Sequence, residues 1–497
     1  MLNGGKARAI QLDGRHYLML AGLVCAYATL LLMLALQGGQ EFGWPVALAV
    51  LVSPVFIGWG IPAMPVAWQK VRALISSIRG PHWIVALLVA SCYIEQFFTA
   101  VGVRNAGDVE QNPVNSINLG RIGLIALAGC IAILTALRGR MAHWQSRSPG
   151  APLFAMLAYA CVALVSASYA SLPLVSAGKA MELVVDVVAF MILTSLLGTE
   201  ELVRYWNLFW LALALMLAGV WISAGLNPAK GFEYQEGAMF PILNGWVPRL
   251  HPNTIGQFAA TLAIVAMARL LARQRAASRR EKILWIGIFV LGFVSMIAAQ
   301  ARTSLASFGL VLFLLLICYR RGGLILASAI AGALAMLSGL GGFLLDFVRR
   351  GQDSELITTL SGRTYYWQEA WDMFRESMAA GHGFYTAHRL DLTARFKILD
   401  LSTVDNTYLE VLLDVGIIGL IPLILALVGL AGALWRSRKI RLPQRWSDVR
   451  LEMIAYFIIA LARSFTGPSF QVHGENLLLL LILMSFTQSI RMKRGLA

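Results

Sequence analysis

Charged residues are scarce in this sequence. Asp, Glu, Lys and Arg make up only 13% of its 497 residues, whereas 58% are hydrophobic. An average soluble domain carries roughly 25% charged residues, so this composition excludes the ordinary soluble class. Apolar runs long enough to cross a ~30 Å hydrocarbon layer as helices recur instead along nearly the whole chain.

Cysteine is also rare. The five cysteines all lie inside or at the end of apolar runs, and none forms a CxxC pair or a cluster with histidine. This distribution argues against a disulfide framework and against a zinc site.

The apolar runs predict an all-α polytopic integral membrane protein with about 14 transmembrane helices. The expected spans are residues 17–36, 44–67, 82–102, 120–137, 151–169, 180–197, 205–225, 254–272, 283–300, 303–319, 324–346, 407–434, 450–466 and 474–490.

Lys and Arg gather in every second loop between these spans and at both ends of the chain. Cations in short loops are retained in the cytoplasm, so both termini are expected there. The formal net charge of +15 is therefore explained by topology. Because the cations are divided among short loops and form no single patch, we expect no nucleic-acid partner.

Two outward loops are long, residues 226–253 and 347–406. A loop of the second length is usually functional. The chain is thus expected to have three parts: helices 1–11 in residues 1–346, a periplasmic loop domain in 347–406, and helices 12–14 in 407–497.

The second long loop contains "SGRTYYWQEAWDMFRESMAAG", which predicts an amphipathic helix at the outer membrane face. Ser361 is its expected N-cap and Gly381 its expected end, with Trp367, Trp371 and Phe374 on one face. Tryptophans also settle at membrane interfaces regardless of function, so this bland interpretation of Trp367 and Trp371 stays open.

Cations gather on the outward side with few carboxylates beside them, which indicates an anionic ligand. These residues are Lys179, Arg249, His251, Arg302 and Arg363. Guanidinium forks match phosphate oxygens, and several together can hold a diphosphate. The outward loops contain no DxD motif and no His-rich motif, so the site is expected to use neither a metal nor another cofactor.

Several of these candidates have a structural alternative. Arg302 and Ser304, in "ARTS", are expected to bind substrate, but Arg302 could simply snorkel to the headgroups. Asn253, after Pro252, could contact the ligand or cap a helix. Lys179 and Glu182, three residues apart on one helical face, are also expected to contact the substrate, but they could pair only with each other. Arg363 is harder to explain structurally, because a cation in the first turn of a helix opposes the macrodipole.

Three stretches together resemble the O-antigen ligase and O-antigen polymerase superfamily: "SGRTYYWQEAWDMF", "AAGHGFYTA" and "VDNTYLEVLLDVGIIGL". The resemblance is most specific over residues 290–425. It implies a GT-C-like fold in the bacterial inner membrane and a periplasmic active site. It also implies metal-independent transfer of an undecaprenyl-diphosphate-linked oligosaccharide.

Carried over to this chain, the resemblance assigns roles to individual residues. Arg302 and Arg363 resemble arginines that grip the diphosphate, and His382 lies in the middle of the Gly-x-Gly loop. "DNTYLE" resembles a stretch in which ligases commonly carry His-Asn, so Asp405 stands where that histidine would be. Asp405 would then be the general base for the acceptor hydroxyl, with Asn406 orienting the acceptor.

Alternatives remain at this point. Asp405 could form a capping box with Ser402, which would leave His382, and after it His388, as the base. The histidine-to-aspartate departure favours a polymerase over a ligase that acts on lipid A-core. A polytopic lipid or solute transporter is a further alternative, although no internal repeat supports it. Membrane lipid is an expected partner, and the resemblance alone suggests a flippase and a chain-length regulator.

Overall fold

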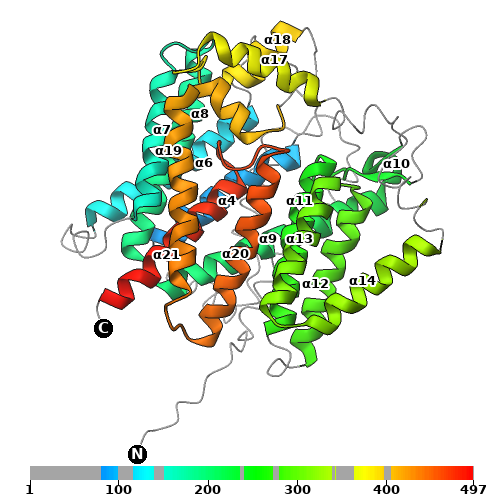
Figure 1. Cartoon of the computed structure of the whole chain (residues 1–497). Helices are drawn as coiled ribbons and strands as arrows, with labels where there is room; N and C mark the ends of the chain where they lie inside the picture. The colour runs from blue at the N-terminus through cyan, green and yellow to red at the C-terminus, as the bar shows by residue number, and fades with distance from the viewer. Residues whose placement is uncertain are drawn as a thin grey trace, which may run out of the picture. The chain divides into compact units, whose positions relative to one another are not determined.

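A computed structural model describes residues 80–98, 116–138, 150–234, 240–272, 279–338, 342, 363–396 and 404–495. The first two predicted spans lie outside these residues. The chain divides into two compact units, residues 1–77 with 225–227, and residues 78–224 with 228–497. Almost all described residues belong to the second unit, which Figure 1 shows as a bundle of helices. The predicted three-part division stays a prediction.

The described elements are helical apart from one antiparallel pair of two-residue strands, in which Phe232 pairs with Leu243 and Glu233 with Ile242. In chain order they are α4 (Gly80–Phe98), α6 (Ser116–Arg138), α7 (Ala151–Ser166), α8 (Pro173–Leu196), α9 (Thr199–Leu226), α10 (Pro228–Gly231), β1 (Phe232–Glu233), β2 (Ile242–Leu243), α11 (Pro252–Ala272), α12 (Arg279–Ala298), α13 (Arg302–Cys318), α14 (Gly322–Leu337), α17 (Arg363–Glu376), the π-helical turn η2 (Ala387–Asp391), α18 (Leu392–Phe396), α19 (Thr407–Ser437), α20 (Gln444–Ser464) and α21 (Glu475–Gly495).

Each remaining predicted span coincides with one of these helices, so the described part of the chain is predominantly α-helical, with many apolar helices. Five described helices, α6, α9, α11, α12 and α19, are long and apolar enough to cross a membrane. Proline stands at the start of α8 and α11, where its fixed φ suits the first helical turn and its missing N–H costs nothing. The total of 14 spans stays a prediction.

Two hydrophobic cores hold the second unit together. The larger joins α7, α8, α19 and α21 with parts of their neighbours, and the second joins α11 to α9, α12 and α13. In α11, 83% of an apolar stretch of 18 residues is buried, whereas only 22% of the corresponding stretch in α6 is buried. A helix buried on nearly every side must be central, so α11 carries the second core while α6 leaves most of its apolar surface for lipid.

Helix α19 is interrupted at Gly416, whose φ of +62° is left-handed. Residues 378–383 cross the helix there and supply the missing hydrogen bonds. His382 N–H donates to Leu413 O over 2.8 Å, and Ile417 N–H donates to Met378 O over 2.9 Å. The end of α17 and the Gly-x-Gly loop are thereby fixed to the first half of α19.

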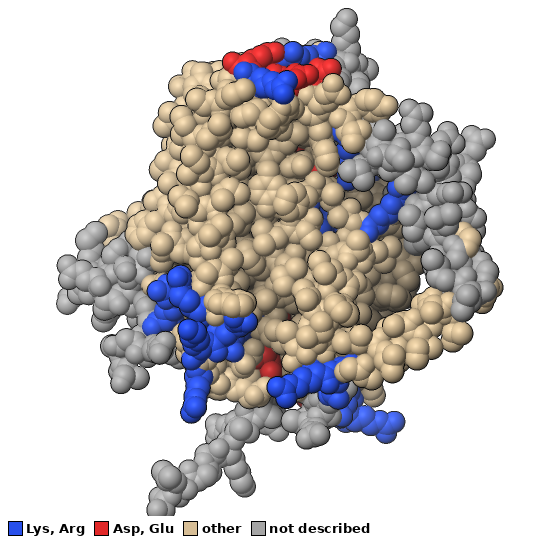
Figure 2. All heavy atoms as spheres, in the orientation of Figure 1, with Lys and Arg blue, Asp and Glu red and all other residues tan. Residues whose placement is uncertain are grey.

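Helix α17 packs on the start of α19 through Phe374, Leu409 and Leu413, which makes it amphipathic as predicted. Trp371 is 42% exposed, whereas the half-buried Trp367 donates its indole N–H to Val404 O over 2.9 Å. Figure 2 shows Lys, Arg, Asp and Glu mixed over α17 and α18, while Lys and Arg predominate at the opposite end of this unit. This asymmetry agrees with the sequence, in which Lys and Arg gather in every second loop.

Candidate active site

Arg363 and Asp405 form an ion pair at the start of α17 and α19. The Nη2 atom of Arg363 lies 2.7 Å from Oδ2 of Asp405, and the two side chains are 18% and 31% exposed. Both charges can therefore be reached from solvent while being partly shielded from it. The structure thus brings together two residues that are 42 positions apart in the sequence.

Asp405 lies just outside α19, with a left-handed backbone of φ +56°. Aspartate and asparagine tolerate this conformation better than most side chains. The N-cap is the next residue, Asn406, whose Oδ1 accepts hydrogen bonds from Tyr408 N–H and Leu409 N–H at 3.1 and 3.2 Å. The helix is thus capped without Asp405, which leaves its carboxylate to Arg363; Ser402 lies outside the described residues.

Two further arginines lie near this pair. Arg302 begins α13, and Arg363 is close enough to affect it electrostatically. Arg463, buried near the end of α20, responds electrostatically to both Asp405 and Arg363. Its Nη1 donates to Ser304 Oγ, and no described residue accepts a hydrogen bond from its Nε. Three guanidinium groups and one carboxylate therefore share the site.

The start of α11 packs directly against the start of α13. A Cβ atom on Gly256 would lie 2.1 Å from that of Ala301, so only glycine allows this approach. Arg249 and His251 are exposed just before α11. The helix begins at Pro252, and His251 Nδ1 accepts a hydrogen bond from Asn253 N–H over 3.2 Å. The suggested cap at Asn253 is therefore wrong, because His251 performs that role.

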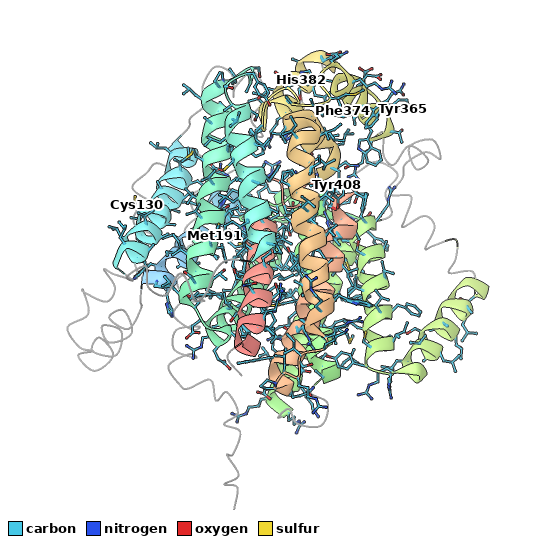
Figure 3. The ribbon with its side chains drawn as sticks, turned by 60° about the vertical axis from the view of Figure 1, so that its left-hand side comes forward. Cys130, Met191, Tyr365, Phe374, His382 and Tyr408 are labelled. Carbon is cyan, nitrogen blue, oxygen red and sulfur yellow. The ribbon has the colours of Figure 1, made fainter. Side chains whose placement is uncertain are left out.

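His382, the second candidate base, is held by the backbone of α17. Its Nε2 lies 2.8 Å from Met373 O, so this nitrogen carries the ring hydrogen and donates a hydrogen bond to the carbonyl. Figure 3 shows His382 at the same end of the unit as Phe374 and Tyr365 of α17. Only Nδ1 of the neutral ring could accept a proton from a substrate.

His388, the third candidate, is paired with Asp414 inside the protein. Its Nδ1 lies 2.9 Å from both carboxylate oxygens of Asp414. Burial alone would lower the pKa of His388, but the charges of Asp414 and Glu410 outweigh burial and raise the pKa to about 9. His388 is consequently protonated at neutral pH and cannot serve as a base there.

Lys179 and Glu182 belong to a second polar cluster. Glu182 accepts from Arg121 at 2.7 Å and lies 3.4 Å from Lys179 Nζ. Lys179 Nζ also lies 5.1 Å from the centre of the Tyr385 ring. The predicted pairing of Lys179 with Glu182 is thus present, and Arg121 completes it. These contacts give both residues a structural role, and their proposed substrate contact stays a prediction.

The segment between α20 and α21 contributes polar groups that the sequence did not reveal. Thr407 Oγ1 donates to Gly467 O over 2.9 Å, and Gln471 Nε2 donates to Glu410. His473 Nδ1 lies 2.7 Å from Asp186 Oδ2. Non-helical backbone among membrane helices must find its hydrogen bonds inside the protein, and this segment does so against α8 and α19.

Hydropathy places Arg463 inside the expected span 450–466 and treats residues 467–473 as a short loop, so it singles out none of Arg463, Gln471 and His473. The only available signal was the polar composition of "ARSFTGPSFQVHGEN" at the outward end of two spans. Arg302 was identified from the same kind of position. The described residues contain no group of three His, Cys, Asp or Glu side chains placed to hold a metal ion.

Such a site suits a ligand with several negative charges. Arginine forks form short, charge-assisted hydrogen bonds with phosphate oxygens, and Asp405 offers a carboxylate beside them that can accept a proton.

Comparison with known families agrees with this interpretation of the site. Residues 287–424 match the family described as O-Antigen ligase, which confirms the resemblance to the O-antigen ligase and polymerase superfamily. The match includes Arg302, Arg363 and Asp405; no curated protein matches the chain.

Proposed function

We propose that this protein is a glycosyltransferase of the O-antigen ligase and polymerase type. In our proposal it is a polysaccharide polymerase of the bacterial inner membrane, and its site faces the periplasm. It transfers an undecaprenyl-diphosphate-linked glycan to a sugar hydroxyl on an acceptor. The observation that carries this proposal is the ion pair of Arg363 with Asp405, together with Arg302 and Arg463 within electrostatic reach of Arg363. Of these residues, only Arg463 lies outside the matched family segment.

The chemistry follows from the residues present. Arg302, Arg363 and Arg463 bind the donor diphosphate and stabilise the charge that develops on it as it leaves. Asp405 accepts the proton of the acceptor hydroxyl, whose oxygen forms a bond to the anomeric carbon while the bond from that carbon to the diphosphate oxygen breaks. Attack opposite to the leaving group inverts the anomeric centre. The guanidinium groups supply the positive charge that a metal ion provides in other diphosphate sites.

The ion pair must open for this reaction to proceed. In the free protein Arg363 neutralises Asp405. A bound diphosphate offers Arg363 a stronger acceptor, so donor binding would free the Asp405 carboxylate for the acceptor hydroxyl. The proposal therefore predicts that the donor binds before the acceptor reacts.

Ligase activity is the second candidate, because the family description names a ligase. The two activities share a donor and differ in the acceptor, a second lipid-linked glycan for a polymerase and lipid A-core for a ligase. We propose further substrate contacts, in addition to those of Arg302, for seven residues: Lys179, Glu182, Arg249, His251, Asn253, Ser304 and Asn406.

The test uses purified full-length protein and lipid-linked repeat units, with and without lipid A-core. Longer lipid-linked glycans would support a polymerase, and glycan on lipid A-core would support a ligase. Movement of the lipid-linked glycan across vesicles without a new glycosidic bond would instead indicate a transporter. Arg363→Ala should abolish either transfer, while Arg375→Ala, on an exposed part of α17, should not.

A further inference from the structure

Glu410 is a buried carboxylate that the proposed reaction does not use. It lies on α19 and is fully buried. Its Oε1 accepts a hydrogen bond from Val404 N–H over 3.0 Å, and its Oε2 accepts from Gln471 Nε2. Burying a charge is costly unless every lone pair is used. A carboxylate kept at this position therefore needs an explanation beyond filling space.

Val404 precedes Asp405, and its N–H and its carbonyl are both hydrogen-bonded. Glu410 binds its N–H, and Trp367 of α17 binds its carbonyl. On the other side of Asp405, Asn406 is fixed as the cap of α19. The left-handed backbone of Asp405 is thus fixed by its two neighbours, and Glu410 contributes by accepting the hydrogen bond from Val404 N–H.

Gln471 connects the same carboxylate to the segment between α20 and α21. Its Oε1 accepts from Ser469 N–H over 2.9 Å, which fixes the orientation of the amide and directs Nε2 towards Glu410. Thr407 binds Gly467 in the same segment. Since Arg463 lies one turn before this segment, Glu410 and Gln471 tie the start of α19 to the chain that carries the third arginine.

We propose that Glu410, held by Gln471, is a positioning residue that sets Asp405 against the donor and acceptor in the glycosyl transfer; this rests on the proposed function. Glu410 touches no substrate in this scheme. It fixes the N–H of Val404, the residue that precedes Asp405, so that the Asp405 carboxylate meets the acceptor hydroxyl in reactive geometry. A misplacement of about 1 Å in such a group can cost about 100-fold in rate.

The hydrogen-bond pattern provides a specific test. In the wild type, two donors, Val404 N–H and Gln471 Nε2, face the Glu410 carboxylate. In Glu410→Gln, the new amide has one acceptor oxygen and one donor nitrogen, so it can accept from only one of these two donors and loses the other hydrogen bond. In Gln471→Glu, two carboxylates face each other. In the double variant Glu410→Gln/Gln471→Glu, Gln at 410 can accept from Val404 and donate to Glu at 471, which still accepts from Ser469. The pattern is then complete again with unchanged total charge.

Each variant is assayed in glycan transfer, with kcat and KM for the lipid-linked donor determined separately. We expect kcat to fall roughly 10- to 100-fold in each single variant, because the reacting groups are misplaced. KM for the donor should change less than about threefold, since the three arginines remain. The double variant should recover most of the lost kcat. Glu376→Gln, exposed on α17, serves as the control and should behave as wild type.

Recovery of kcat in the double variant supports positioning, because a catalytic carboxylate at 410 could not be replaced by glutamine. A folded double variant that stays as slow as Glu410→Gln would overturn the inference, as would a Glu410→Gln variant with wild-type kcat. If the wild-type protein transfers no glycan to either acceptor, the proposed function fails and the positioning role fails with it. Transfer by the wild type without rescue overturns the positioning role alone.

Discussion

Arg363 lies 2.7 Å from Asp405, so the cation proposed to bind the donor and the carboxylate proposed to activate the acceptor neutralise each other in the free protein. An internal carboxylate bound to an arginine competes with any external anion for it. The same pair therefore links donor binding to activation of the acceptor, and substitution of either partner should affect the two steps differently.

Asp405→Asn is expected to bind inorganic pyrophosphate and undecaprenyl diphosphate more tightly while losing transfer. The substitution removes the competing charge but keeps a side chain suited to the left-handed backbone. Because a charge-assisted hydrogen bond is worth about 1.5–3 kcal/mol and this one is partly exposed, roughly three- to tenfold tighter binding is expected. Titration calorimetry and the transfer assay measure the two effects. Asp372→Asn, on exposed α17, should change neither; weaker pyrophosphate binding in Asp405→Asn would contradict the proposal.

Arg463→Lys should impair use of the donor although it retains the charge. Lysine cannot reproduce the planar fork that reaches Ser304 and the ligand together. We expect kcat/KM for the lipid-linked donor to fall at least about tenfold, which corresponds to about 1.4 kcal/mol of lost transition-state binding. Arg436→Lys, on α19 at the opposite end of the unit, provides the matched control. Equal kcat/KM values for Arg463→Lys and the wild type would remove Arg463 from the site.

Most of the helices could be predicted from sequence because the length of an apolar run is a local property. The proximity of Arg363 to Asp405 could be suspected from the motif resemblance, since both belong to conspicuous polar stretches. Arg463 and Gln471 could not, because they reach the site through contacts such as Arg463 with Ser304, 159 positions away. Hydropathy contains no information about such pairings. The cap at Asn406 and the role of His251 were missed because helix starts shift by one or two residues against any sequence pattern.

The His388–Asp414 pair should make the stability of the protein depend on pH in the alkaline range. The folded protein raises the pKa of His388 from 6.5 to about 9, so the folded state binds this proton more tightly than the unfolded state does. The resulting stabilisation is fully present below pH 6.5 and is lost as the pH rises through about 9. The melting temperature in detergent should therefore fall by a few degrees from pH 6.5 to pH 9.5. In His388→Gln this part of the pH dependence should disappear; an unchanged pH profile would contradict the assignment.

Gly416→Ala should destabilise the protein, because the crossing of residues 378–383 over α19 requires glycine there. The backbone is left-handed at φ +62°, and an added Cβ would lie 2.3 Å from Ala379 O. A left-handed non-glycine residue costs about 1–3 kcal/mol, and the clash with a backbone carbonyl adds to that. Gly432→Ala is the control in the same helix, since its nearest contact would be the flexible Arg436 side chain at 3.6 Å; alanine there should be neutral or stabilising by about 0.5–1 kcal/mol. Melting temperatures of the two variants compare these effects directly. Because the crossing also places His382 and the end of α17, Gly416→Ala should lose transfer activity together with stability, whereas Gly432→Ala should keep both.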